Sequence, residues 1–513
     1  MGKHHHQRSL LSPQMPSLNL ILTCRLRSLW GGANHLKAIE DLIKLNVVDS
    51  AEVIHTLRPR TSALFKTYDG IEIIGHRMLL EVLEEINRLL EEEDAKVTKI
   101  SFVGYSLGGL VSRYIIGELE KLQLFDMIEP VYYATFASPH LGVKFYKSHL
   151  KPINFLLANV LGRVGSELAI RDNDQMLVKL TEDEYITGLA RFKHRFLFAN
   201  IRHDRTVNFH TSYITDRNPF NDHWDTLDLN FNFTPSIVST YRIRGMTIAP
   251  KLVNFTNSTF QSSQYVKRPV SIYKRLRYAG IVILLACIVP LWIPIVFTAS
   301  TIGSIVSSFI VKTYKKQTYE ELRKLITYDQ LPGNAITATE SGSSAISKRR
   351  DSSGSSIRER LDEATSEAFE NVINVTQYDA HTDSAKDHGA GRYTNQFSVV
   401  DDCTPNLVDH VHEIFLNPKD DDFEIFQKTE RLPLDETRQL VMQRLNALDW
   451  KKFAVYVNVL NAHDGIVARK GLKRSTVKGI ALIGFWTGMI NEYEKREKRE
   501  ALSFTRPGLA VSS

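Results

Sequence analysis

Residues 97–119 read VTKISFVGYSLGGLVSRYIIGEL, and this stretch decides the fold. Its first part, Val97 to Val103, is rich in β-branched residues and predicts a buried strand. Its last part, Leu110 to Leu119, predicts a helix. Between them lies the sequence GYSLGG, residues 104–109, which has the pattern G-x-S-x-G. In this pattern the chain turns sharply from a strand into a helix.

This turn favours a reactive role for Ser106. It is so tight that the serine adopts strained dihedral angles, and no Cβ fits at the flanking glycines. The serine oxygen is thereby held above the edge of the sheet, at the positive end of the following helix. We therefore predict that Ser106 is a nucleophile on an elbow formed with Gly104 and Gly108. The alternative is a glycine-rich helix start with an idle serine.

A serine hydroxyl needs a base to take its proton, so a histidine and an orienting carboxylate must follow Ser106. After such a turn, the acid and then the histidine come from loops behind later strands. Asp204 follows the predicted strand Arg195 to Ala199, and His463 follows the predicted strand Phe453 to Val459. These two residues are the predicted acid and base. The alternatives for the acid are Asp216 and Asp225. The histidines that lie before or beside the acid do not fit the order: His76, His203 and His210.

The chain from Leu18 to about Tyr213 alternates short apolar runs with amphipathic stretches, which is typical of βαβ units on a parallel sheet. The fold class predicted is α/β, with a mostly parallel sheet. We expect these parts in chain order: a disordered N-terminus at 1–17, a core at 18–270 with a cap at about 150–192, the C-terminal part of the core at 396–490 with the catalytic histidine, and a tail at 491–513. The helix predicted last in the core runs from about Pro433 to Leu448.

Composition narrows the function classes. The 513 residues are 43% hydrophobic and 24% charged, so a sizeable core is possible with length left for insertions. The net charge of +6 comes without a basic stripe interleaved with aromatic residues, so nucleic acid is not an expected partner. Three dispersed cysteines argue against a disulfide framework or a zinc site and favour a reducing compartment. The N-terminus lacks the pattern of a signal peptide.

Two insertions interrupt the core. Tyr278 to Val311 holds 34 residues without a formal charge, with lysines and arginines on both flanks and Pro290 and Pro294 near the middle. This length exceeds the ~20 apolar residues of a spanning helix, so we expect the segment to embed in a membrane. Residues 332–395 are rich in Ser, Gly, Asp, Glu and Arg, which predicts a disordered linker.

Several short motifs together resemble a family of serine esterases with the α/β-hydrolase fold, whose best-known fungal member is a lipid-droplet phospholipase. The motifs are Leu29-Trp30-Gly31, Asp69-Gly70 with Gly75, Gly104 to Gly109, Ser138-Pro139-His140-Leu141-Gly142, Gly162-Arg163-Val164-Gly165, Asn200 with Asp204 and Val207, and Ala462-His463-Asp464. The resemblance implies hydrolysis of acyl esters in phospholipids or neutral lipids, without a metal or an organic cofactor. It also implies an oxyanion hole made by the backbone amides of Leu29 and Leu107.

The chain departs from this family at one place. The family has His-Gly before Leu-Trp-Gly, whereas this chain has Arg27-Ser28. The glycine lets the loop approach the reacting carbonyl, so Arg27 and Ser28 would displace the second oxyanion donor. A catalytically weakened, membrane-bound scaffold is therefore an alternative to an active enzyme. An acyltransferase or thioesterase with the same three residues is another.

The order of the site residues constrains the membrane segment. Asp204 precedes it and His463 follows it, so both flanks must lie on the same side of the membrane if the two side chains are to meet. We therefore expect a hairpin that turns near Pro290 and Pro294. The predicted protein is a lipase or phospholipase that binds a membrane or lipid-droplet monolayer through Tyr278 to Val311. Its expected location is the lipid droplet and the endoplasmic reticulum, with the catalytic domain in the cytosol; its protein partners are unknown.

Overall fold

The computed structural model describes most of the predicted core. The described residues are 17–25, 36–48, 50, 52–59, 70–146, 154, 158, 162–222, 224–261, 298, 316–317, 320–321, 397–401 and 406–504. Four predicted segments lie outside these ranges: residues 1–16, the loop of Arg27, Ser28 and Leu29, the linker at 332–395, and the hairpin at 278–311 except for Thr298.

The centre of the fold is a sheet of six parallel strands in the order β11-β5-β4-β3-β1-β2. The α/β class predicted from the sequence is therefore confirmed. The strands are β1 (Ser17–Arg25), β2 (Val53–Leu57), β3 (Lys96–Tyr105), β4 (Glu129–Phe136), β5 (His194–Asn200) and β11 (Trp450–Val455). The strand order reverses at β1, because β2 lies on one side of β1 and β3 on the other. In open parallel sheets such a switch point, at the carboxyl ends of the strands, is where ligands bind.

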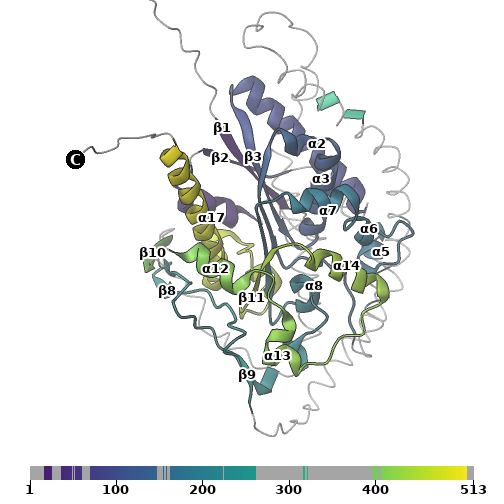
Figure 1. Ribbon diagram of the computed structural model, residues 1–513, viewed down its shortest axis with the longest axis vertical. Helices are drawn as coiled ribbons and strands as arrows, with labels where there is room; N and C mark the ends of the chain where they lie inside the picture. The colour runs from purple at the N-terminus through teal and green to yellow at the C-terminus, as the bar shows by residue number, and fades with distance from the viewer. Residues whose placement is uncertain are drawn as a thin grey trace, which may run out of the picture.

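Helices cover both faces of this sheet (Figure 1). On one face, α2 (Ile71–Glu92), α3 (Leu107–Lys121) and α7 (Asp183–Ala190) pack on one hydrophobic cluster. On the other, α1 (Lys37–Asn46), α12 (Leu407–Phe415) and α17 (Val477–Phe504) pack on a second cluster. Because α7 packs against α3, it belongs to the layer on the sheet, although it lies within the region predicted as a cap. None of the helices within the described ranges is long and apolar enough to cross a membrane.

Shorter elements lie at the ends and edges of these layers. The helices are α5 (Gly162–Ala169), α6 (Met176–Lys179), α8 (Phe209–Tyr213), α9 (Pro219–Asp222), α13 (Glu424–Gln427), α14 (Glu436–Asn446), α15 (Ala462–Gly465) and α16 (Gly471–Arg474), with 3-10 turns at Leu124–Asp126, Trp224–Thr226 and Asp420–Asp422. The small strands are β6 (Leu227–Asp228), β7 (Thr240–Ile243), β8 (Met246–Ile248), β9 (Thr259–Phe260) and β10 (Phe397–Asp401).

A three-stranded sheet of β10, β7 and β8 joins the two halves of the chain. β10 follows the insertions and pairs with β7, which precedes them, with Phe397 opposite Ile243. β8 completes this sheet in the order β10-β7-β8, and β7 and β8 both contact α17. The parts of the core before residue 261 and after residue 397 therefore contact each other directly.

The C-terminal helix extends into the region predicted as a tail. α17 runs to Phe504, and the side chain of Glu494 is buried. Glu494 accepts hydrogen bonds from the Asn19 amide at 3.3 Å and from the Tyr132 hydroxyl at 2.9 Å. These contacts with β1 and β4 hold α17 on the sheet at Glu494, inside the predicted tail, whereas the side chains of residues 498–503 are exposed.

Candidate active site

The serine turn has the geometry that its sequence predicts. Ser106 lies between β3 and α3 with φ 54° and ψ −130°, a backbone conformation that L-residues rarely adopt. The Ser106 amide donates to the carbonyl of Phe136 at the end of β4, at 3.0 Å. This bond fixes the turn to the neighbouring strand, so the hydroxyl is held at the carboxyl edge of the sheet.

Crowding explains the glycines of the turn. A Cβ on Gly104 would lie 2.5 Å from the Cα of Gly109, so β3 and the first turn of α3 touch through backbone alone. A Cβ on Gly109 would in turn fall on the side chain of Ser138, 2.7 Å from its Cβ. Gly109, which was not among the predicted elbow residues, is thus as constrained as Gly104. The second flanking glycine, Gly108, is buried in the first turn of α3.

We expect Gly109→Ala to destabilise the fold by about 1–3 kcal/mol, because the extra methyl group would overlap the buried side chain of Ser138. The free energy of unfolding in urea measures this loss. The double variant Gly109→Ala with Ser138→Gly should recover part of it, because it removes the side chain that the methyl group meets first. Equal stability of the parent and Gly109→Ala would show that the turn can open.

The predicted acid is held by its own loop. Asp204 follows β5, and its Oδ1 accepts hydrogen bonds from the amide of Thr206 at 3.1 Å and the amide of Val207 at 2.9 Å. The Thr206 hydroxyl donates to the same oxygen at 3.1 Å. One carboxylate oxygen is therefore anchored, and the other, Oδ2, is available to a partner.

That partner is His463. His463 Nδ1 lies 2.8 Å from Asp204 Oδ2, and His463 Nε2 lies 3.0 Å from Ser106 Oγ. The side chains of His463 and Asp204 are only 7% and 3% exposed, so their interaction is shielded from water. The structure thus brings together three residues that are far apart in the sequence, in the order and geometry of a serine, base and acid relay.

The loops that carry the acid and the base are tied to each other. The Asn200 side chain at the end of β5 accepts from the amide of Val457 at 2.8 Å, and the Ala462 amide donates to the carbonyl of His203 at 3.3 Å. The Asn200 side chain therefore bonds the Val457 amide in place of a neighbouring strand. β11 ends at Val455, whereas the sequence predicted an end at Val459. His463 follows on α15, whose first turn the Asn461 side chain caps.

A second layer of polar side chains supports the imidazole. The Tyr105 ring lies against the His463 ring with centroids 4.9 Å apart, and its hydroxyl donates to Asp464 Oδ1 at 3.1 Å. Arg469 also donates to Asp464 Oδ1, at 2.5 Å, and Asn461 Nδ2 donates to Oδ2 at 2.9 Å. Tyr105 and Arg469 were not predicted as site residues. The buried pair Asp464–Arg469 thus fixes the turn that presents His463.

The surroundings of His463 set its proton affinity. Burial lowers the pKa of the imidazole, but the charge of Asp204, its hydrogen bond and the charge of Asp464 raise it, while Arg469 opposes them. The resulting pKa lies above the ordinary value of 6.5. His463 is therefore a stronger base than a free histidine.

A general base must be neutral, so the activity should fall as the pH drops through the pKa of His463. We expect the acid limb of kcat/KM on a soluble ester to have its midpoint above 6.5, and Asp204→Asn to move the midpoint down. The variant loses the charge that raises the pKa. A midpoint that does not respond to Asp204→Asn would assign the limb to another group.

Other histidines are poorly suited to this role. His140 is fully buried, and burial, then the charges of Arg113 and Lys452, hold its pKa well below 6.5. Burial likewise lowers the pKa of His210 to about 3. The motif at 138–142 instead positions loops, since the Leu141 amide donates to the Thr211 hydroxyl at 2.9 Å.

The predicted oxyanion donors are placed only in part. Leu107 is the first residue of α3, so its amide belongs to the helix N-terminus next to Ser106. Leu29, the other predicted donor, lies outside the described residues. In the described part of the chain, no group of three or more His, Cys, Asp or Glu side chains gathers for a metal ion.

Comparison with known proteins agrees with this chemistry. Residues 22–215 match the family described as "Putative serine esterase (DUF676)", a segment that contains Ser106 and Asp204 and ends before His463. The chain is 31% identical to Putative lipase YDL109C of Saccharomyces cerevisiae over 153 residues, which are 29% of this chain and 23% of the relative. It is 29% identical over 154 residues to Putative lipase ROG1 of the same yeast, covering 29% of this chain and 21% of the relative. It is 28% identical over 197 residues to Putative lipase C4A8.10 of Schizosaccharomyces pombe, covering 36% of this chain and 25% of the relative.

The matched segments thus span a quarter or less of the length of these curated relatives. No solved structure matches the chain significantly.

Proposed function

We propose that this chain, which carries a serine esterase segment and resembles proteins named as lipases, hydrolyses acyl ester bonds of phospholipids or neutral lipids at a lipid surface. The observation that carries the proposal is the relay from Asp204 through His463 to Ser106, with both links at hydrogen-bonding distance.

The relay accounts for each step of ester hydrolysis. Ser106 Oγ attacks the ester carbonyl while its proton moves to His463 Nε2. The negative charge that develops on the carbonyl oxygen is stabilised by the Leu107 amide at the start of α3, and the resemblance implies a second donor, the Leu29 amide. The imidazolium of His463 then protonates the leaving alcohol, and the acyl group remains on Ser106. Water, deprotonated by His463, releases the acid and restores the serine.

Asp204 makes the two proton transfers possible. Its Oδ2 accepts the Nδ1 proton of His463, so Nε2 is left to face Ser106 as the acceptor. It also stabilises the imidazolium that forms after the attack. Because its other oxygen is fixed by the amides of Thr206 and Val207, the carboxylate keeps the ring in one orientation.

Labelling with a fluorophosphonate tests whether the serine is reactive. We expect the full chain to be labelled and the Ser106→Ala variant to remain unlabelled. Release of free fatty acid from phospholipid vesicles then separates hydrolysis from transfer to an acceptor alcohol or from thioester cleavage. A folded, unlabelled parent protein would favour the scaffold with a damaged oxyanion loop and contradict the proposed hydrolysis.

We also propose that the segment from Tyr278 to Val311 is a membrane hairpin and that both of its flanks face the cytosol. Two arms of ~15 residues reach ~22 Å each, which is short of the ~30 Å core of a bilayer and suits a monolayer. Contacts of the folded core support the placement of both flanks on the same side of the membrane. Glu321, which follows the segment in the chain, accepts a hydrogen bond from Asn87 of α2 at 2.7 Å. The pairing of β10 with β7 supports it too.

We expect tags placed near Ser353 and at the N-terminus to be equally accessible from the cytosol in selectively permeabilised cells. Replacing Pro290 and Pro294 with leucine should favour one continuous helix and move the protein from droplets to the endoplasmic reticulum. A tag near Ser353 that is protected from protease in the active parent protein would contradict the hairpin.

A further inference from the structure

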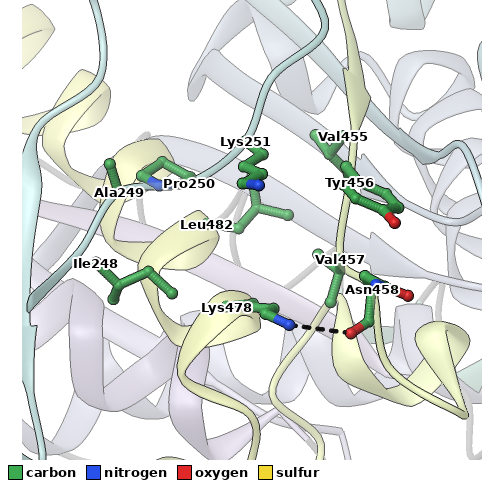
Figure 2. Close-up of a pocket in the computed structure, with 10 residues that line it drawn as sticks. All are labelled: Ile248, Ala249, Pro250, Lys251, Val455, Tyr456, Val457, Asn458, Lys478 and Leu482. Carbon is green, nitrogen blue, oxygen red and sulfur yellow. Dashed lines mark hydrogen bonds between the residues drawn. The ribbon is translucent and has the colours of Figure 1, made fainter. Parts of the chain in front are cut away.

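A pocket that the catalytic relay does not use opens beside β11 (Figure 2). Its volume is about 220 Å³, and its walls come from the chain after β8, from the end of β11 and from the first turns of α17. The lining is mainly apolar, with Ile248, Val457 and Leu482 among the side chains drawn. This volume is below the ~300–1,000 Å³ of sites that enclose a whole small molecule, so the pocket fits a head group.

Two lysines from different elements line this pocket, and the Lys251 ammonium also lies over the rings of Phe231 and Tyr456, 5.3 and 6.0 Å from their centroids. Lys251 comes from the loop after β8 and Lys478 from the first turn of α17, and Figure 2 shows both among the side chains that surround it. Lys478 Nζ donates to the carbonyl of Asn458 at 3.2 Å, which fixes its direction. Among the ten residues that line the pocket, none is acidic. The pocket therefore favours an anionic group.

The loop that carries Lys251 is held against β11. The Lys251 carbonyl accepts from the Tyr456 amide at 2.9 Å, and the Val253 amide donates to the Ala454 carbonyl at 2.9 Å. Arg244 in the turn between β7 and β8 donates to the carbonyl of Lys473 at 2.9 Å. These contacts tie the walls of the pocket to the sheet and to the chain before α17, so the cavity is a built feature of the fold.

The chain segments that supply two walls of the pocket are basic in sequence. The segments 240–253 and 465–490 contain no aspartate or glutamate. They supply a basic rim that consists of Arg244, Lys251, Lys473, Arg474 and Lys478. Two large apolar side chains are exposed close by in the sequence, Met246 at 39% and Leu460 at 40%. A positive rim with exposed apolar side chains matches an anionic lipid surface.

We propose that this pocket binds the phosphate head group of an anionic phospholipid while the basic rim rests on the lipid surface. The pocket lies at the carboxyl end of β11, the same edge of the sheet at which Ser106 and His463 meet. A lipid held there turns the catalytic edge toward the surface that supplies the substrate. That consequence rests on the proposed hydrolysis of lipids, whereas the binding itself does not.

Co-sedimentation of the full chain with vesicles tests the proposal. The Ser106→Ala variant is used so that the lipid stays intact, and phosphatidylcholine vesicles are compared with phosphatidylcholine vesicles that contain phosphatidate. The uncharged segment at 278–311 contributes with both lipids, and its basic flanks are the same in the parent and in every variant, so the part of the phosphatidate-dependent increment that a pocket variant loses is due to the pocket. We expect a clear increment that weakens with added salt.

Variants locate the site. Lys251→Gln and Lys478→Gln should each reduce the increment roughly fivefold, the effect of one cation at an anionic surface. Ala249→Phe, or Ala249→Leu if the larger side chain lowers the melting temperature, should reduce it as well, because it fills the pocket without changing charge. The matched control removes two exposed cations elsewhere, Lys96 at the start of β3 and Lys428 after α13, and should leave the increment unchanged.

Three results would overturn the proposal. If both lysine variants bind the vesicles as well as the parent protein does, the site is excluded. If both Ala249 variants bind as well as the parent, the binding is due to diffuse surface charge and not to the pocket. Displacement of the vesicles by soluble glycerol 3-phosphate would identify a soluble phosphate ester as the ligand. Hydrolysis is measured separately on a short soluble ester, which Lys251→Gln should cleave like the parent. A failure of lipid binding is thus distinguishable from a failure of catalysis.

Discussion

Replacing Ser106 with alanine is expected to lower kcat for acyl-ester hydrolysis by about 10⁶, the loss that follows removal of the nucleophile of such a relay. The fold should survive, because the Ser106 hydroxyl contacts only His463 among the bonds described above. The hydrogen bond from the Ser106 backbone amide to the Phe136 carbonyl does not involve the side chain. The backbone conformation of the turn is the same for alanine, which also has a Cβ. The measurement is steady-state hydrolysis of a short-chain ester, with the melting temperature as a check on folding.

A serine in the same helix provides the matched control. Ser112 lies in α3 and donates to the Gly109 carbonyl at 2.9 Å, so Ser112→Ala removes a hydroxyl without touching the relay. Its hydrolysis should stay within a few-fold of the parent. Retention of hydrolysis by Ser106→Ala at the level of Ser112→Ala would end the serine mechanism.

The second large effect concerns the acid. Asp204→Asn should lower kcat by about 10⁴, because an asparagine can donate to Nδ1 and so stabilise the wrong tautomer of His463. The anchoring bonds from Thr206 and Val207 to Oδ1 can still form, so the loss should reside in kcat and leave the fold intact. Steady-state kinetics and thermal unfolding separate these two effects.

Two aspartates downstream serve as controls, since each fits the order of the sequence as an acid. Asp216 pairs with Arg431 at 3.1 Å, and Asp225 lies in the short turn Trp224–Thr226. Asp216→Asn and Asp225→Asn should each retain hydrolysis near the parent level. A loss of activity confined to one of these variants, with Asp204→Asn active, would reassign the acid.

The candidate site residues could be selected from the sequence because the chemistry depends on local order. A strand, a glycine-flanked serine and a helix can be identified in a single stretch, and the carboxyl ends of parallel strands necessarily meet at one edge of the sheet. Placing one acid and one histidine behind later strands therefore favoured Asp204 and His463, with Asp216 and Asp225 as alternatives for the acid. The structure places His463 at hydrogen-bonding distance from both Ser106 and Asp204.

The sequence was less informative where polar residues are buried. β11 begins at Trp450, three residues earlier than predicted, because Lys451 and Lys452 lie inside the core and resemble a surface loop in the sequence. Burial lowers the pKa of Lys452 to about 8, and its amine donates to Asn446 at 2.8 Å. Burial of these lysines depends on contacts with distant segments, which no local pattern contains.

The same limit applies to the layer behind His463. Asp464 and Arg469 are five residues apart, and nothing in that spacing distinguishes a buried ion pair from two surface charges. The burial of the pair depends on Tyr105 of distant β3, which packs against His463 and donates to Asp464. The charged end of α17 was interpreted as a tail for a similar reason, because the buried partners of Glu494 come from β1 and β4.

The long interval between acid and base has a consequence for how the molecule can be assembled. Asp204 and His463 are 259 residues apart, and β11 and α17 contact the rest of the core through strand pairing, packing and hydrogen bonds such as those of Glu494. Two separately expressed fragments, one ending after β9 and one starting before β10, would therefore carry complementary interfaces. Neither fragment alone holds a complete relay, so hydrolysis would arise only upon reassembly and would depend on the concentration of both. In genetic terms, two alleles that are each inactive would complement one another.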